Sequence, residues 1–84
     1  MKFPLHTRVA VSIDLPAEGI RRGDVATIVG CHPATRAGGE PGYSIEVFNA
    51  IGETRAVVTL PESQLEALHR DEALSVRRLK SHAA

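Results

Sequence analysis

The sequence is poor in cysteine and in aromatic residues: among its 84 residues it has one cysteine, no tryptophan, one tyrosine and two phenylalanines. A single cysteine, Cys31, cannot form an internal disulfide, and a chain this short would usually carry several in an oxidising compartment. We therefore expect a cytoplasmic location. The N-terminus reaches Arg8 before any apolar run builds, a pattern that predicts neither a signal peptide nor a membrane span.

An excess of charge of either sign is also missing, since ten basic residues offset ten acidic ones. The overall positive charge typical of a nucleic-acid binder is therefore absent, although a local basic patch is compatible with a zero sum. The short length excludes more. A domain of this size buries only about 60% of the surface that its unfolded chain exposes, which leaves room for one core and for no deep cleft between lobes. No cofactor is expected.

The apolar residues that are present recur mainly with a period of two, which is the pattern of half-buried strands. Proline and glycine clusters separate the strands and mark the turns. The pattern predicts strands over residues 5–13, 24–32, 43–49, 55–60 and 64–68, with a 3₁₀ turn near residues 61–63. Five short strands at this spacing predict a mainly β fold, a small five-stranded SH3-like barrel.

The second predicted strand departs from strict alternation, because Val25, Ala26, Ile28, Val29 and Cys31 do not fit on one face. Either the strand is covered on both sides, or a β-bulge near Ala26 and the following threonine switches its face midway. We favour the bulge, because a barrel this small requires sharply bent strands.

The chain divides into a barrel over residues 1–69 and a basic C-terminal tail over residues 70–84. In the tail, Ala73, Val76 and Leu79 recur at helical spacing, which allows a short amphipathic helix. An isolated helix of this length is only marginally stable in water, so a disordered tail is the favoured alternative.

Two segments carry a family resemblance. They are Leu15 to Val25, with its Leu-Pro pair, Gly19 and basic-Gly-Asp turn, and Ala56 to Leu65, which reads Ala-Val-Val-Thr-Leu-Pro-Glu-Ser-Gln-Leu. With these segments the chain resembles a bacterial family known only as domain-of-unknown-function family 4926, over roughly residues 3–68. Ala26 departs from the glycine common in that family, and Ala50-Ile51-Gly52 replaces its usual Asp-Gly turn. The resemblance implies an SH3-like barrel of unassigned function. It also implies a protein-binding or antitoxin-like role beside a larger partner encoded nearby.

Neither metal binding nor catalysis is predicted. The four histidines are scattered, and the adjacent Cys31 and His32 should point to opposite faces of a strand, so they do not form a ligand set. Cys31 lies in an apolar strand, where it is expected to fill core volume rather than act as a nucleophile. The serines lack a nucleophile-elbow context. We therefore expect a protein that is not an enzyme.

The acidic residues Asp14, Glu18 and Asp24 border one turn region. Beside Arg21 and Arg22 they are expected to form solvated ion pairs, which contribute little to stability. Asp24 is expected to tie the turn at the preceding glycine through its side chain.

A partner protein is the favoured target. Phe48 and Val57 lie opposite the inward-facing sets of their strands, and together with Ile51 they mark an interface if they are exposed, either with another protein or with a second copy. The residues predicted to bind the partner are Arg21, Arg22, Phe48, Arg55, Val57, Arg77 and Arg78. The alternative is a KOW-like RNA-binding or ribosome-associated barrel that uses the same arginines, although single-strand binders usually need more aromatic platforms than this chain offers.

Overall fold

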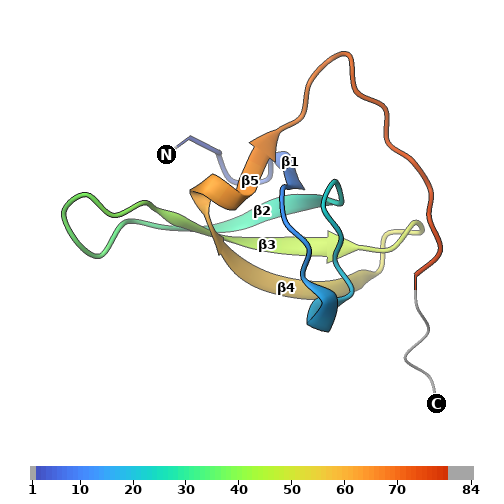
Figure 1. The fold of residues 1–84 in the computed structure, drawn as a ribbon, viewed down its shortest axis with the longest axis horizontal. Helices are drawn as coiled ribbons and strands as arrows, with labels where there is room; N and C mark the ends of the chain where they lie inside the picture. Colours follow the sequence, from blue (N-terminus) through green and yellow to red (C-terminus); the bar gives the residue numbers. More distant parts are fainter. Residues whose placement is uncertain (1, 80–84) are drawn as a thin grey trace.

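Five antiparallel strands form one sheet in the computed structural model, which describes residues 2–79 (Figure 1). The strands are β1 (Arg8–Val11), β2 (Val25–His32), β3 (Gly42–Phe48), β4 (Thr54–Pro61) and β5 (Leu65–Ala67), in the order β4-β3-β2-β1-β5. Two 3₁₀ turns accompany them, η1 (Pro16–Glu18) and η2 (Glu62–Gln64). The mainly β, five-stranded prediction is confirmed, and the 3₁₀ turn expected near residues 61–63 lies one residue later. The turn η1 was not predicted.

One face of the sheet carries the core. Val9 of β1, Ile28 of β2 and Ile45 of β3 are fully buried on that face. They belong to the inward-facing sets that a period of two predicts for these strands. Ile20, from the connection between β1 and β2, joins the same cluster. Two backbone hydrogen bonds between Leu15 and Ile20 close that connection around η1.

The first strand is shorter than the predicted residues 5–13. His6 has a φ of +69°, in the left-handed region, and the Thr7 amide bonds back to the Pro4 carbonyl, so the chain turns before β1 begins. Leu5 is consequently exposed rather than inward-facing. The alternation at Leu5 therefore arose by chance, because a turn breaks the strand between it and Val9.

The second strand does contain a bulge, but not where it was predicted. The pairing of β2 with β3 runs from Ile28 opposite Ile45 directly to Gly30 opposite Ser44, so Val29 is the extra residue. The bulge expected at Ala26 is wrong, because Ala26 already alternates correctly with Ile28. The extra residue at position 29 returns Cys31 to the core side, where it is half-buried and packs against the core.

Tyr43 joins three parts of the molecule. Its ring is fully buried and meets the Phe3 ring edge-on, with centroids 5.4 Å apart. Its hydroxyl accepts the Phe3 amide at 3.3 Å and donates to Glu62 Oε2 at 2.5 Å. One side chain of β3 thus holds both the N-terminal segment and η2.

The Tyr43 hydroxyl predicts a loss of stability in alkali. Burial raises the pKa of Tyr43, and the hydrogen bond to Glu62 raises it further. Because the folded pKa exceeds the unfolded one, this stabilisation is complete below the ordinary tyrosine value of about 10 and is lost as pH rises through the folded pKa. Urea unfolding across that range should show a steeper alkaline loss for the native chain than for Tyr43→Phe. Equal slopes for the two proteins would show that the hydroxyl does not titrate in this way.

The chain after β5 contains no helix or strand up to residue 79. The helical alternative for the tail is therefore wrong for residues 70–79, and residues 80–84 of the predicted tail lie outside the described part. Among residues 2–79, no helix is both long enough and apolar enough to span a membrane.

Candidate binding groove

The segment from Leu68 to Leu79, which we call the strap, leaves the end of β5 and arches away from the sheet. In Figure 1 it runs from orange to red and descends beside the end of the sheet where β3 leads into β4. A small turn starts it: the His69 amide donates to Glu72 Oε1 at 2.6 Å, and the Glu72 amide donates to the His69 carbonyl at 3.1 Å. Beyond this turn the strap is extended.

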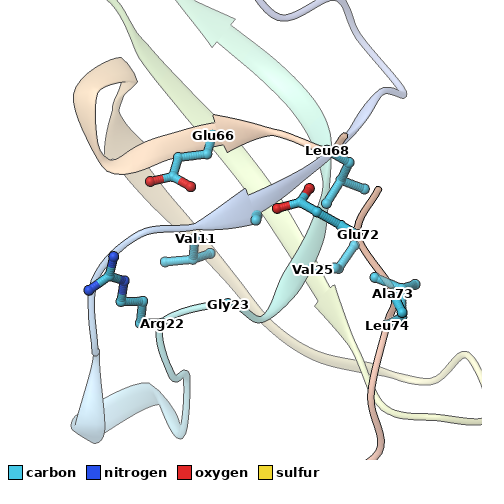
Figure 2. A pocket seen from close by; sticks show the side chains of 10 residues that line it. Val11, Arg22, Gly23, Val25, Glu66, Leu68, Glu72, Ala73 and Leu74 are labelled. Atoms are coloured by element: carbon cyan, nitrogen blue, oxygen red, sulfur yellow. The ribbon is translucent and has the colours of Figure 1, made fainter. Parts of the chain in front are cut away.

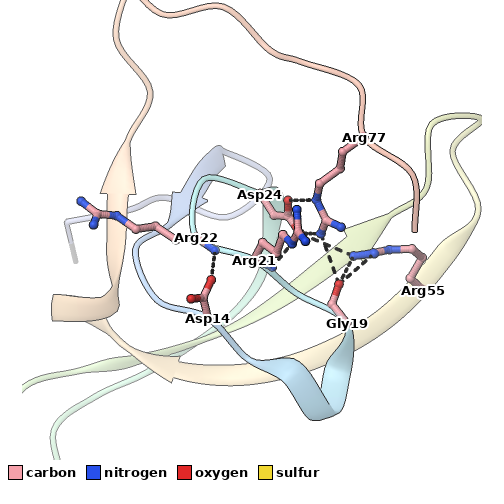
Figure 3. Close-up of polar contacts among 7 residues, drawn as sticks. All are labelled: Asp14, Gly19, Arg21, Arg22, Asp24, Arg55 and Arg77. Atoms are coloured by element: carbon pink, nitrogen blue, oxygen red, sulfur yellow. Dashed lines mark hydrogen bonds and ion pairs between the residues drawn. The ribbon is translucent and has the colours of Figure 1, made fainter. Parts of the chain in front are cut away.

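Arg77 links the far end of the strap to the connection between β1 and β2. Its guanidinium donates from Nη2 to Asp24 Oδ2 at 2.5 Å and from Nε to Asp24 Oδ1 at 3.1 Å, and Nη2 also reaches the Gly19 carbonyl at 3.3 Å (Figure 3). A guanidinium that binds both oxygens of a carboxylate fixes direction as well as distance. The strap is therefore linked to the rest of the chain at Arg77, although it has no regular secondary structure.

Arg55 approaches the same two acceptors from β4. Its Nη1 and Nη2 donate to the Gly19 carbonyl at 3.3 and 3.4 Å, and Nη2 lies 3.7 Å from Asp24 Oδ2. Its Nε is buried and has no hydrogen-bond partner within the described chain. We call Gly19, Asp24, Arg55 and Arg77 the arginine cluster. It contains two guanidiniums and one carboxylate.

Asp24 organises the turn before β2 as well as the cluster. Its Oδ2 accepts the Arg21 amide at 3.0 Å, and its own amide donates to the Arg21 carbonyl at 2.9 Å, which confirms the predicted tie across the turn. Burial raises the pKa of Asp24, but the Arg77 hydrogen bond, the Arg21 amide and the two guanidinium charges outweigh it, so the pKa lies below its ordinary value.

The ion pairs predicted for Arg21 and Arg22 are wrong. Asp14 Oδ1 accepts the backbone amide of Arg22 at 2.9 Å, and Asp24 takes the backbone amide of Arg21. Short acidic side chains next to a turn reach backbone amides more readily than they reach the ends of long arginines. Within residues 2–79, neither Arg21 nor Arg22 forms an ion pair through its side chain, and both residues are exposed.

Between the strap and the sheet lies a groove of about 710 Å³, which we call the strap groove. Five of the seven predicted partner-binding residues line it: Arg21, Arg22, Phe48, Arg55 and Arg77. Val57 and Arg78 do not. Val57 is nevertheless 59% exposed and Phe48 38% exposed, so both lie on the outward side, as their positions in the strands predicted.

The charge of the strap groove is unbalanced. Five arginines line it, the four just named and Arg8, against a single acid, Asp24. The residues that line the groove thus carry a net charge of plus four, in a chain whose total charge is zero. Arg8 was not among the predicted site residues, although its outward position in β1, across from Thr27 of β2, could have indicated it.

A second, smaller groove of about 330 Å³ lies between the start of the strap, β1 and β5 (Figure 2). Its charged residues are Arg22, Glu66 and Glu72, so acids predominate there. Figure 2 shows the two carboxylates rising from β5 and from the strap. Anionic ligands therefore favour the strap groove over this one.

The described residues were also compared with the requirements of metal binding and of nucleophilic catalysis. Across residues 2–79, no three side chains of the metal-binding types gather closely enough to hold a metal ion. His32 Nε2 lies 2.8 Å from Ser44 Oγ, which in turn lies 3.1 Å from Thr59 Oγ1, a set that the sequence reasoning missed. Nucleophilic catalysis would also need a group that orients the other imidazole nitrogen, and the described residues supply none. The three side chains form a cross-strand hydrogen-bonded row on the outer face of the sheet.

A sequence model described as "Domain of unknown function (DUF4926)" matches residues 5–67, three quarters of the chain. The match runs from just before β1 to the end of β5, so it includes Asp24 and Arg55 and stops short of the strap. Searches of the curated proteins and of the solved structures found no significant match.

Proposed function

Because the chain belongs to the DUF4926 family, whose description names no activity, we propose its function from the strap groove: it is a non-enzymatic module that binds another protein. The observation that carries this proposal is the gathering of Phe48 and five arginines along one groove. Aromatic and arginine side chains are the types that contribute most to the energy of protein–protein interfaces.

The exposed apolar residues support the same proposal. Phe48 lies on β3, Val57 lies on β4, and Ile51, which is 80% exposed, lies on the turn that joins these strands. Large apolar side chains exposed on one hairpin of a small domain are typical of an interface. A second copy of the chain and a different protein are both partners that could cover them.

The fold suits a binding role. The strand order β4-β3-β2-β1-β5 and the 3₁₀ turn between β4 and β5 support an SH3-like barrel, a scaffold that presents loops and grooves for contact. A single half-buried cysteine supports a cytoplasmic location. The proposed partner is the product of a neighbouring gene, which the protein would bind as an inhibitory, antitoxin-like subunit.

Co-expression with the neighbouring gene product tests this proposal. We expect a stoichiometric complex that Phe48→Ala weakens at least about tenfold, because a central aromatic anchor contributes more than 1.4 kcal/mol. Val29→Ala is the matched control, since Val29 is equally exposed at 38% but does not line the groove. It should change the affinity less than about twofold. Absence of a complex, or equal losses for the two variants, would refute the proposal.

The excess of arginines favours RNA as a second candidate. Binding of this kind would depend on phosphate contacts, so the logarithm of the binding constant for bulk RNA should fall linearly with the logarithm of the salt concentration. Phe48 is the one exposed aromatic ring within residues 2–79, which limits base stacking. An RNA affinity that does not respond to salt would eliminate this candidate.

A further inference from the structure

The arginine cluster is one carboxylate short of charge balance. Asp24 directs both of its oxygens to Arg77, and Arg55 is left with a neutral carbonyl and a 3.7 Å approach to the same carboxylate. Arg55 is only 16% exposed, so water screens its charge incompletely. A further negative group placed in the strap groove would meet an attraction that Asp24 does not already neutralise.

The groove also has an apolar component. Val25 and Phe48 contribute to it from the sheet, and Leu74 and Val76 contribute from the strap. Its volume of about 710 Å³ falls within the range of ligand-binding clefts. A ligand that fits both properties carries negative groups and apolar groups in close succession. A simple phosphate or a uniformly charged polymer has only the first.

From these two properties we infer that the strap groove binds an extended segment of a partner protein in which acidic and apolar residues alternate. Successive side chains of an extended segment point to opposite sides, so acids can face Arg21, Arg55 and their neighbours while apolar side chains contact Phe48 and Val76. The inference rests on the proposed function and specifies the chemistry of its partner.

Single-stranded RNA fits the groove less well. It would satisfy the arginines, but its bases need stacking surfaces, and Phe48 is the one ring that lines the groove. The apolar side chains from the strap would gain no partner from a phosphate backbone. The combination of charge and apolar surface therefore favours a peptide over a nucleic acid.

The experiment uses the full chain and fluorescently labelled peptides. A short peptide of alternating glutamate and leucine is compared by anisotropy with lysine–leucine and glutamate–serine peptides of equal length, and with poly(U) RNA. We expect the glutamate–leucine peptide to bind at least about tenfold more tightly than either other peptide, and more tightly than the RNA.

Two matched variants locate the binding. Arg21→Glu reverses a charge in the groove and should weaken the binding of the glutamate–leucine peptide at least about tenfold. Arg36→Glu reverses an exposed charge in the loop between β2 and β3, outside the groove, and should change the affinity less than about twofold. Unchanged thermal unfolding of both variants shows that the fold is retained.

Several results would overturn the inference. They are tighter binding of the lysine–leucine peptide, tighter and steeply salt-dependent binding of poly(U), equal effects of the two variants, or no binding of any probe. Self-association that excludes the peptide would assign the groove to a second copy instead. If the neighbouring gene product still forms a Phe48-dependent complex, the proposed function stands while this account of the partner's chemistry fails.

Discussion

Replacing Tyr43 by alanine is expected to lower the free energy of unfolding by about 3–5 kcal/mol, the usual cost of truncating a buried aromatic side chain. The total stability of a domain of this length is about 4–10 kcal/mol, so the substitution should remove roughly a third or more of it. Tyr43 is fully buried and joins Phe3 to Glu62, and its loss therefore leaves a cavity and also releases two segments. Thermal unfolding followed by circular dichroism measures the effect.

Two comparison variants separate the contributions. Tyr43→Phe keeps the ring against Phe3 and loses only the hydroxyl, so it should cost about 1–2 kcal/mol. Val57→Ala removes an exposed side chain and should change the stability by less than about 0.5 kcal/mol. A Tyr43→Ala variant as stable as Val57→Ala would show that the core does not depend on this ring.

The strands were predictable because each one buries a single face. Tyr43, Ile45 and Val47 alternate along β3, and all three are buried. The bulge in β2 was predictable in kind but not in position, since a run of apolar residues does not reveal which residue is the extra one. The late start of β1, at Arg8, could not be predicted for a different reason. The positive φ of His6 is a property of the backbone, and the alternation of apolar residues does not reveal it.

The site was predictable in composition but not in arrangement. The arginines were predicted to bind a partner from their positions near the loops, and five of the seven residues in that prediction line one groove. What the sequence could not indicate is that Arg77 lies against Asp24, 53 positions earlier. That contact requires the strap to be extended, whereas the spacing of Ala73, Val76 and Leu79 is equally compatible with a helix.

The extended strap also changes the meaning of the predicted arginines. Arg55 and Arg77 were proposed as free contacts for a partner, and both instead bind the Gly19 carbonyl and Asp24 within the chain. Arg8, Arg21 and Arg22 are exposed at the same groove. Two of the five lining arginines thus shape the groove, and Arg55 among them keeps charge that Asp24 does not neutralise, while the three exposed arginines are available to a ligand.

Asp24 is the residue on which this arrangement depends most. Replacing Asp24 by alanine is expected to lower the free energy of unfolding by about 2–3 kcal/mol, because it removes the bond to the Arg21 amide and leaves two partly buried guanidiniums without a carboxylate. Arg77→Ala should lower the free energy of unfolding by only about 1 kcal/mol, because the hydrogen bond from the Arg21 amide to Asp24 remains. Both variants should free the strap, which ¹⁵N relaxation would detect as lower order at residues 73–79.

Lowering the pH should destabilise the native chain in the same way as Asp24→Ala does. Because the pKa of Asp24 is lower in the folded chain than in the unfolded chain, its stabilisation is present above the ordinary aspartate value of about 3.9 and is lost as pH falls through the folded value. The stability difference between the native chain and Asp24→Ala should therefore shrink in that range. Asp71→Ala removes an exposed aspartate outside the arginine cluster and should leave the order of residues 73–79 unchanged. If the difference for Asp24→Ala stayed constant into strong acid, the carboxylate charge would not be what holds the strap.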